Sequence, residues 1–145
     1  MSKRAVSMLS FLALMFYAAT ALSVEQQRET ENHIIYFNVL PTSALPEAMA
    51  RAYGITRSET RVLLNVTVHR TSEDNPGPVR ARIEAQAVNL TGQLKRFRLR
   101  ELSEDDAIYY IGDIGISSGE NLNFEIRVTP EGSDAEEVIQ FRRAF

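Results

Sequence analysis

Apolar and polar side chains alternate along most of this 145-residue chain, beginning near His33. The alternation is clearest between Thr60 and Arg70, where the apolar positions follow a period of two: Val62, Leu64, Val66 and Val68. The residues between them are mostly polar. Because successive side chains of a strand point to opposite faces, this pattern predicts a β-strand with one face in a core and the other in polar surroundings.

Six other segments show the same alternation or are rich in β-branched and aromatic residues, which favour strands. They span residues 33–40, 79–87, 94–102, 107–116, 121–129 and 136–145. Turn residues separate them. In Asn75-Pro76-Gly77-Pro78, for example, a proline and a glycine stand at the two central positions of a type II turn. The chain is therefore expected to form seven short strands.

The segment Leu45–Ile55 has a helical pattern instead. Pro46 suits a first helical turn, and Gly54 can adopt the left-handed conformation that ends a helix. We expect a short helix lying on a sheet. The core is expected to contain apolar residues from three of the strands: Leu64, Val66, Phe124, Ile126 and Phe141.

These elements predict an all-β fold, an immunoglobulin-like antiparallel β-sandwich of about seven strands with one short helix. A small open barrel is the alternative. The chain has no cysteine and no tryptophan, so the assignment depends on the strand pattern and not on the Cys…Trp…Cys signature of immunoglobulin domains. A single domain is expected over residues 33–145. The polar residues 24–32 before it are expected to be a flexible lead-in.

Residues 1–23 have a different character. Lys3 and Arg4 precede an apolar stretch that runs from Ala5 to Leu22 and ends in small side chains. This order is typical of a secretory signal peptide, with cleavage expected before Leu22 or before Val24. An uncleaved N-terminal anchor is the alternative, because the stretch is near the lower length limit for spanning a bilayer. After cleavage we expect no stable membrane anchor and a periplasmic location.

The charge of the mature chain argues against one class of partner. Without Lys3 and Arg4, 14 basic residues stand against 19 acidic ones, which gives a net charge of −5. A nucleic-acid partner is therefore not expected. The absence of cysteine also excludes a thiol nucleophile and a disulfide framework, so packing and strand hydrogen bonds must hold this exported domain together.

Arginine provides the candidate binding residues. Five arginines alternate on two consecutive predicted strands: Arg80, Arg82, Arg96, Arg98 and Arg100. If these strands pair through the turn at Thr91-Gly92, the guanidinium groups form one cationic patch on an acidic protein. Guanidinium groups suit carboxylate and phosphate partners. The simpler interpretation is a solvated sheet face whose arginines pair with neighbouring acids, since surface ion pairs are common and individually weak.

Catalytic chemistry has few candidate residues. A hydrolase needs a nucleophile and a positioned base, and the chain's two histidines are His33 and His69. The acidic run at 104–106 could supply oxygen ligands to calcium, but it lacks the ligand spacing of a dedicated calcium loop. We assign no catalytic residue, no metal ligand and no cofactor from the sequence.

Five blocks along the chain resemble a small exported bacterial family, domain of unknown function number 4426. They are AYGITRS (52–58), LLNVTV (63–68), NLTGQL (89–94), DAIYYIGDI (106–114) and VTPEG (128–132). The resemblance extends from about His33 to Phe145. It implies a bacterial, Gram-negative, periplasmic protein, and it brings no known activity or functional residue.

Two functions of different classes follow. The preferred one is an exported non-catalytic binding or accessory module of the bacterial cell envelope, whose partner is a protein or an anionic envelope component. The alternative is a small periplasmic hydrolase or metal-dependent enzyme that uses His33, His69 and the acidic 104–106 loop. The enzyme requires these side chains to converge in one cleft, whereas the binding module does not.

Overall fold

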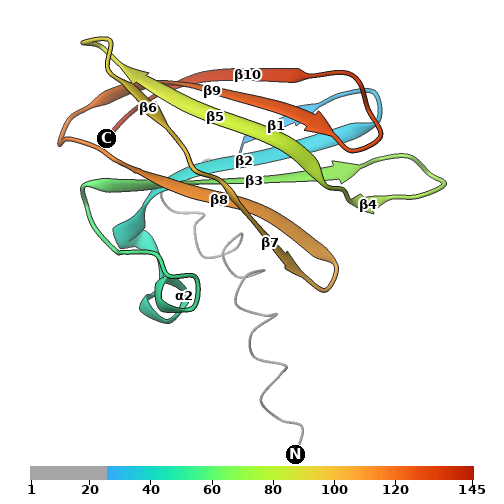
Figure 1. Ribbon diagram of the computed structural model, residues 1–145, viewed down its shortest axis with the longest axis horizontal. Coiled ribbons are helices and arrows are strands. Elements are labelled where there is room, and N and C mark those ends of the chain that lie inside the picture. The colour runs from blue at the N-terminus through green and yellow to red at the C-terminus, as the bar shows by residue number, and fades with distance from the viewer. Residues whose placement is uncertain (1–25) are drawn as a thin grey trace, which may run out of the picture.

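A computed structural model describes residues 26–145 as two antiparallel β-sheets packed face to face (Figure 1). The larger sheet has the order β1 (Gln26–Glu29), β2 (His33–Pro41), β3 (Arg61–Arg70), β8 (Ala107–Gly115) and β7 (Arg100–Glu104), with β4 (Gly77–Pro78) paired to β3. The smaller sheet has the order β10 (Glu137–Ala144), β9 (Asn121–Pro130), β5 (Ala81–Asn89) and β6 (Leu94–Arg96). The predicted β-sandwich is confirmed, and the open barrel is not formed.

The predicted core lies between the two sheets. Leu64, Val66 and Ile126 are fully buried, and Phe124 keeps 2% of its surface exposed. Phe141, which is partly buried, stacks on Phe124 with ring centroids 4.7 Å apart. The period-two pattern thus assigned these side chains to the correct face of their strands.

Strand β3 departs from the expectation of one core face and one mostly polar face. Leu63, on its other face, is also buried, in a second apolar cluster with Leu45 and Met49. This cluster forms because the short helix α2 (Glu47–Ala52) covers the outer face of the larger sheet, below β3 in Figure 1. The helix is shorter than the predicted 45–55, and a 3-10 turn, η2 (Thr42–Ala44), precedes it.

The lead-in at 24–32 was expected to be flexible, but part of it is a strand. Gln26–Glu29 form β1 and pair with β2, with Gln26 opposite Phe37 and Glu29 opposite Ile34. Strand pairing uses backbone groups, so a polar segment without hydrophobic periodicity can still become an edge strand. Periodicity alone therefore missed β1.

The segment 94–102 was expected to be one strand, and the structure divides it between the sheets. Leu94–Arg96 form β6 on the edge of the smaller sheet, whereas Arg100–Glu104 form β7 on the edge of the larger one. Between them the chain crosses from one sheet to the other, with Phe97 buried in the core. This sheet switch, the crossing segment 97–99, shapes the candidate site.

Candidate functional site: an arginine-lined groove

An open groove of about 480 Å³ lies beside the crossing segment. We call it the arginine groove, and its lining residues are Arg61, Gln93, Lys95, Arg96, Arg98, Asp113, Ile114 and Gly115. Four of these side chains are cationic and one is anionic. The groove is therefore locally positive on a chain whose formal net charge is −3.

A glycine allows the crossing segment to lie close to β8. A Cβ atom added to Gly112 would approach the backbone carbonyl oxygen of Arg98 to 2.8 Å, closer than real Cβ contacts come. Any side chain at position 112 would push the segment away from the sheet. Gly112 thus determines where the backbone of Arg98 lies along one wall of the groove.

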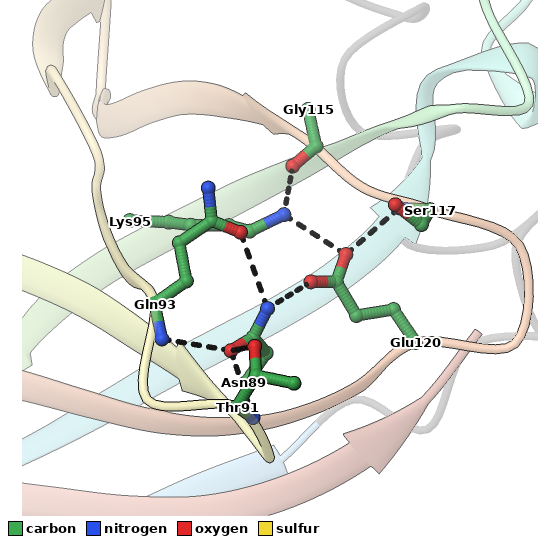
Figure 2. A network of polar contacts seen from close by, with 7 residues as sticks. All are labelled: Asn89, Thr91, Gln93, Lys95, Gly115, Ser117 and Glu120. Atoms are coloured by element: carbon green, nitrogen blue, oxygen red, sulfur yellow. Dashed lines mark hydrogen bonds and ion pairs between the residues drawn. The ribbon is translucent and has the colours of Figure 1, made fainter.

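A polar network fixes the end of the groove formed by the β5–β6 hairpin (Figure 2). The ammonium of Lys95 donates to a carboxylate oxygen of Glu120 at 2.9 Å and to the backbone carbonyl of Gly115 at 2.8 Å. The same carboxylate accepts hydrogen bonds from the Asn89 side chain and the Ser117 backbone N–H, each at 2.8 Å. The network therefore ties the hairpin to the turn between β8 and β9.

Glu120 is the anionic centre of this network, and 8% of its side chain is exposed. Burial alone would raise the pKa of its carboxyl group. The hydrogen bonds from Lys95, Asn89 and the Ser117 N–H outweigh that effect and lower the pKa to about 2. Glu120 is therefore ionised across the pH range of most bacterial environments, and Lys95 remains neutralised by it.

Two of the five predicted arginines, Arg96 and Arg98, line the groove together. Both are exposed, and within residues 26–145 neither makes an ion pair or a side-chain hydrogen bond. Arg61, by contrast, is paired with Asp113 at 2.5 Å across the groove floor. Arg96 and Arg98 are thus the lining guanidinium groups without a partner in the described part of the chain.

The other three predicted arginines lie elsewhere. Arg80 pairs with Glu101 at 3.0 Å, and this contact links the two sheets. Arg82, near the start of β5, reaches only the Thr129 hydroxyl at 3.5 Å. Arg100 belongs to the larger sheet and donates to the backbone carbonyl of Tyr53. The single five-arginine patch expected from the sequence does not form, because the chain leaves the smaller sheet after Arg96.

The histidines and the acidic run do not converge. His33 stands opposite Arg70 and His69 stands opposite Ile34, so the two histidines lie on adjacent strands. The two side chains belong to opposite faces of the sheet. His33 is two positions from Ile35 and shares its inward face, whereas His69 contacts the Tyr36 ring on the outer face, with ring centroids 5.6 Å apart. Burial lowers the pKa of both imidazoles. A shared histidine site is excluded by this strand alternation.

The acidic 104–106 run forms the tight turn between β7 and β8. Asp105 takes the positive φ of 42° there. Glu104 accepts a hydrogen bond from the Tyr53 hydroxyl at 2.8 Å. Burial, reinforced by this carboxylate, raises the pKa of Tyr53 and keeps the phenol protonated. The run thus attaches helix α2 to the β7–β8 hairpin.

Sequence reasoning did not find the groove's other wall. Arg61 and Asp113 are 52 positions apart in the chain and meet only because β3 and β8 are neighbours. Lys95 and Glu120 are likewise 25 positions apart, with Lys95 in β6 and Glu120 in the turn between β8 and β9. The one sequence signal was the glycine in the tyrosine- and isoleucine-rich segment at Gly112, which indicates a close backbone approach.

The fold and the groove define the class of protein: a small two-sheet β-sandwich with a cation-lined groove where the chain passes between its sheets. The chain belongs to the family described as domain of unknown function DUF4426, whose model matches residues 27–145. This confirms the resemblance seen in the sequence. No curated protein matches the chain.

Solved structures share this fold. A DUF4426 family protein from Pseudomonas aeruginosa is 29% identical, with a TM-score of 0.70 over 83% of this chain and 94% of that one. A copper-bound variant of FetP from uropathogenic Escherichia coli strain F11 is 11% identical, with a TM-score of 0.56 over 85% and 90% of the two chains. FetP as isolated, recombinantly expressed in the periplasm of E. coli, is 12% identical, with a TM-score of 0.57 over 85% and 94%. At these identities the likeness to FetP shows the fold alone.

The described residues do not fit a copper site. Copper favours imidazole and sulfur ligands. Here the two histidines lie on opposite faces of a sheet, and Met49 of helix α2 is buried in the apolar cluster between the helix and the sheet. Between residues 26 and 145, no three His, Cys, Asp or Glu side chains lie close enough together to hold a metal ion. In the same range, no helix has the length and apolar character that a membrane span requires.

Proposed function

We propose that this protein is an exported, non-catalytic binding module of the bacterial cell envelope, and that Arg96 and Arg98 in the arginine groove bind an anionic envelope component. One observation carries this proposal: two exposed guanidinium groups line a groove together and have no anionic partner among the described residues. Arg80, in contrast, is paired with Glu101.

The groove suits a carboxylate- or phosphate-bearing ligand for two physical reasons. Guanidinium groups donate paired N–H bonds that match the geometry of these anions. The volume of about 480 Å³ lies within the roughly 300–1,000 Å³ of small-molecule sites. Because Arg61 and Lys95 are already neutralised by Asp113 and Glu120, the net attraction comes from Arg96 and Arg98.

Export is supported by the sequence and by the family's fold. The cationic and apolar leader, with its two cleavage sites, lies outside the described residues. FetP, which shares the fold, was recombinantly expressed in the periplasm. Residues 26–145 form the folded sandwich, so removal of the leader before Leu22 or Val24 leaves every described strand intact.

The test compares matched charge reversals. The double variant Arg96→Glu and Arg98→Glu removes both unpaired guanidinium groups, and Arg82→Glu is the control because Arg82 lies on the same sheet outside the groove. Binding of inorganic phosphate and of acetate is followed at low salt by NMR of the backbone N–H groups of the groove, which wild type and variants share. Phosphatidylglycerol vesicles provide a membrane-bound phosphate, and phosphatidylcholine vesicles provide the neutral reference.

We expect the double variant to lose at least tenfold in anion affinity and most of its salt dependence, because few ionic contacts remain to be screened. Arg82→Glu should stay within about twofold of the wild type. Equal binding by the wild type and the folded double variant would contradict the proposal, as would an equal loss in the control.

A further inference from the structure

Strand β10 forms an edge of the smaller sheet and offers a second candidate surface, separate from the groove. We propose that β10 is the interface of a homodimer, in which the β10 strands of two copies pair antiparallel and join the two smaller sheets into one. Strand β10 extends over eight residues, Glu137–Ala144, and pairs with β9 on one side. No residue of 26–145 pairs with its other side.

The charges along this edge are self-complementary. Acidic Glu136 and Glu137 stand at its beginning, and basic Arg142 and Arg143 stand near its end. A second copy in antiparallel orientation brings the acidic end of one strand to the basic end of the other, twice by symmetry. A parallel copy would instead place like charges side by side, which destabilises a strand pair.

The exposed face of β10 favours one register. Val138, Gln140 and Arg142 share that face by strand alternation, and Glu136 stands just before the strand, two positions ahead of Val138. When Ile139 is the centre of symmetry, Glu136 of one copy lies across from Arg142 of the other, and Val138 lies across from Gln140. Arg142 is exposed and makes no ion pair within the described chain. Glu136 is 40% exposed and already pairs with Arg127 at 3.0 Å, so Arg142 of a second copy would join that surface pair rather than meet a free carboxylate.

The edge keeps one of the usual protections of an edge strand and lacks two others. Natural edges are often blocked by proline, a bulge or an inward-pointing charged residue. Arg143 is such a residue, because it shares the inward face with Ile139 and Phe141 and donates to the backbone carbonyl of Val39 in β2. Strand β10 contains no proline and pairs with β9 without a bulge from Glu137 to Ala144. Val138 is one of three large apolar residues among the described ones that remain exposed, at 40%. Covering it is favourable, since apolar surface then leaves water.

Such a dimer leaves the arginine groove open. The strand order β10-β9-β5-β6 places β10 on one edge of the smaller sheet and β6, which lines the groove, on the other. The dimer therefore carries two groove copies at the far edges of one continuous eight-stranded sheet. Dimerisation and anion binding can be disrupted separately.

The test uses sedimentation equilibrium of the mature chain and charge-swapped variants. Arg142→Glu makes both charged positions of the outward face, 136 and 142, acidic and should weaken dimerisation at least tenfold. The double variant Glu136→Arg with Arg142→Glu restores opposite charges at these two positions and should recover the dimer. Mixing the single variants Glu136→Arg and Arg142→Glu should give a heterodimer, because basic outward positions of one copy then face acidic ones of the other. Arg82→Glu, with the same charge change away from β10, should dimerise like the wild type.

Circular dichroism and thermal unfolding of each variant show that it is folded before its mass is interpreted. A wild-type monomer at millimolar concentration would overturn the proposal, as would a folded Arg142→Glu variant that dimerises as tightly as the wild type. A third outcome would also overturn the proposal: both single variants lose the dimer, and neither the double variant nor the mixture recovers it. That result would point to a different protein as the edge partner. Anion binding is also measured with the folded Arg142→Glu monomer. If this monomer binds anions like the wild type, the dimer and the arginine groove are tested independently.

Discussion

Single residues hold this sandwich together in two ways, by aromatic packing in the core and by one nearly buried ion pair. Phe124 represents the first, because it contacts the rings of Phe97, Phe141 and Phe145. Glu120 represents the second, because its contacts with Lys95, Asn89 and Ser117 join the β5–β6 hairpin to the turn between β8 and β9. Both residues can be tested by substitutions that leave the backbone unchanged.

Replacing Phe124 by alanine should lower the free energy of unfolding by about 3–5 kcal/mol. The side chain is 2% exposed, and its loss leaves a cavity that the stacked Phe141 ring cannot fill without leaving its own position. Denaturant unfolding measures the loss. Val138→Ala, at an exposed site, should change stability by less than about 0.5 kcal/mol in the monomer. A loss below about 1 kcal/mol for Phe124→Ala would contradict the core described above.

Glu120 makes stability depend on acid pH in a defined direction. The pKa of its carboxyl group is lowered in the folded state from 4.5 to about 2, so the folded protein binds fewer protons than the unfolded chain in that interval. This contribution to stability is complete above about pH 4.5 and is lost as the pH falls toward 2.

Glu120→Gln should therefore lower stability at pH 7, by roughly 1–3 kcal/mol, and should flatten the loss between pH 4.5 and 2. The measurement is chemical unfolding at several pH values. Glu73→Gln, in an exposed turn, serves as the control and should reproduce the wild-type profile. An unchanged acid profile in Glu120→Gln would show that another group governs acid unfolding.

At the scale of elements, the crossing between β6 and β7 is the feature that converts a regular sandwich into one with a groove. It places Arg96 on the smaller sheet and Arg100 on the larger one, with Arg98 between them. The close packing of Arg98 on Gly112 of β8 holds this arrangement. The groove thus depends on a glycine that does not line it.

Gly112→Ala should destabilise the protein by about 1–3 kcal/mol, because the backbone of Arg98 must move to make room for a Cβ atom. The same movement should weaken anion binding in the groove. Gly115→Ala is a matched control on the same strand, since a Cβ atom there would meet nothing closer than 3.9 Å. Equal stability of the two variants would contradict the close approach at Gly112.

At the scale of the whole molecule, the cleavage expected from the sequence falls a few residues before β1. Cleavage before Leu22 or Val24 leaves at least two residues before Gln26, where β1 begins. N-terminal sequencing of the periplasmic protein should therefore yield Leu22 or Val24 as the first residue. Recovery of Met1 in the membrane fraction would show instead that the leader is retained as an anchor.

The sequence by itself determined most of the strands, the short helix and the family. Alternation placed Leu64, Phe124 and Ile126 in the core, since side-chain direction in a strand has a strict period of two. The same alternation predicted one continuous strand over 94–102, which was wrong. Periodicity indicates which face a side chain takes but not which sheet the backbone joins. It also missed β1, whose pairing with β2 uses backbone groups and needs no apolar pattern.

Only the tertiary structure decided the site. Arg96 and Arg98 were visible as an alternating pair, and the sheet switch at Phe97 separates them from Arg100. Arg82 is on the same sheet as Arg96 but lies four residues along β5 from Gln86, the partner of Arg96. The contacts Arg61–Asp113 and Lys95–Glu120 join segments that are distant in sequence, the first between two strands and the second between a strand and a turn. Such contacts depend on strand order, and strand order is set by how the two sheets pack as a whole rather than by any local pattern.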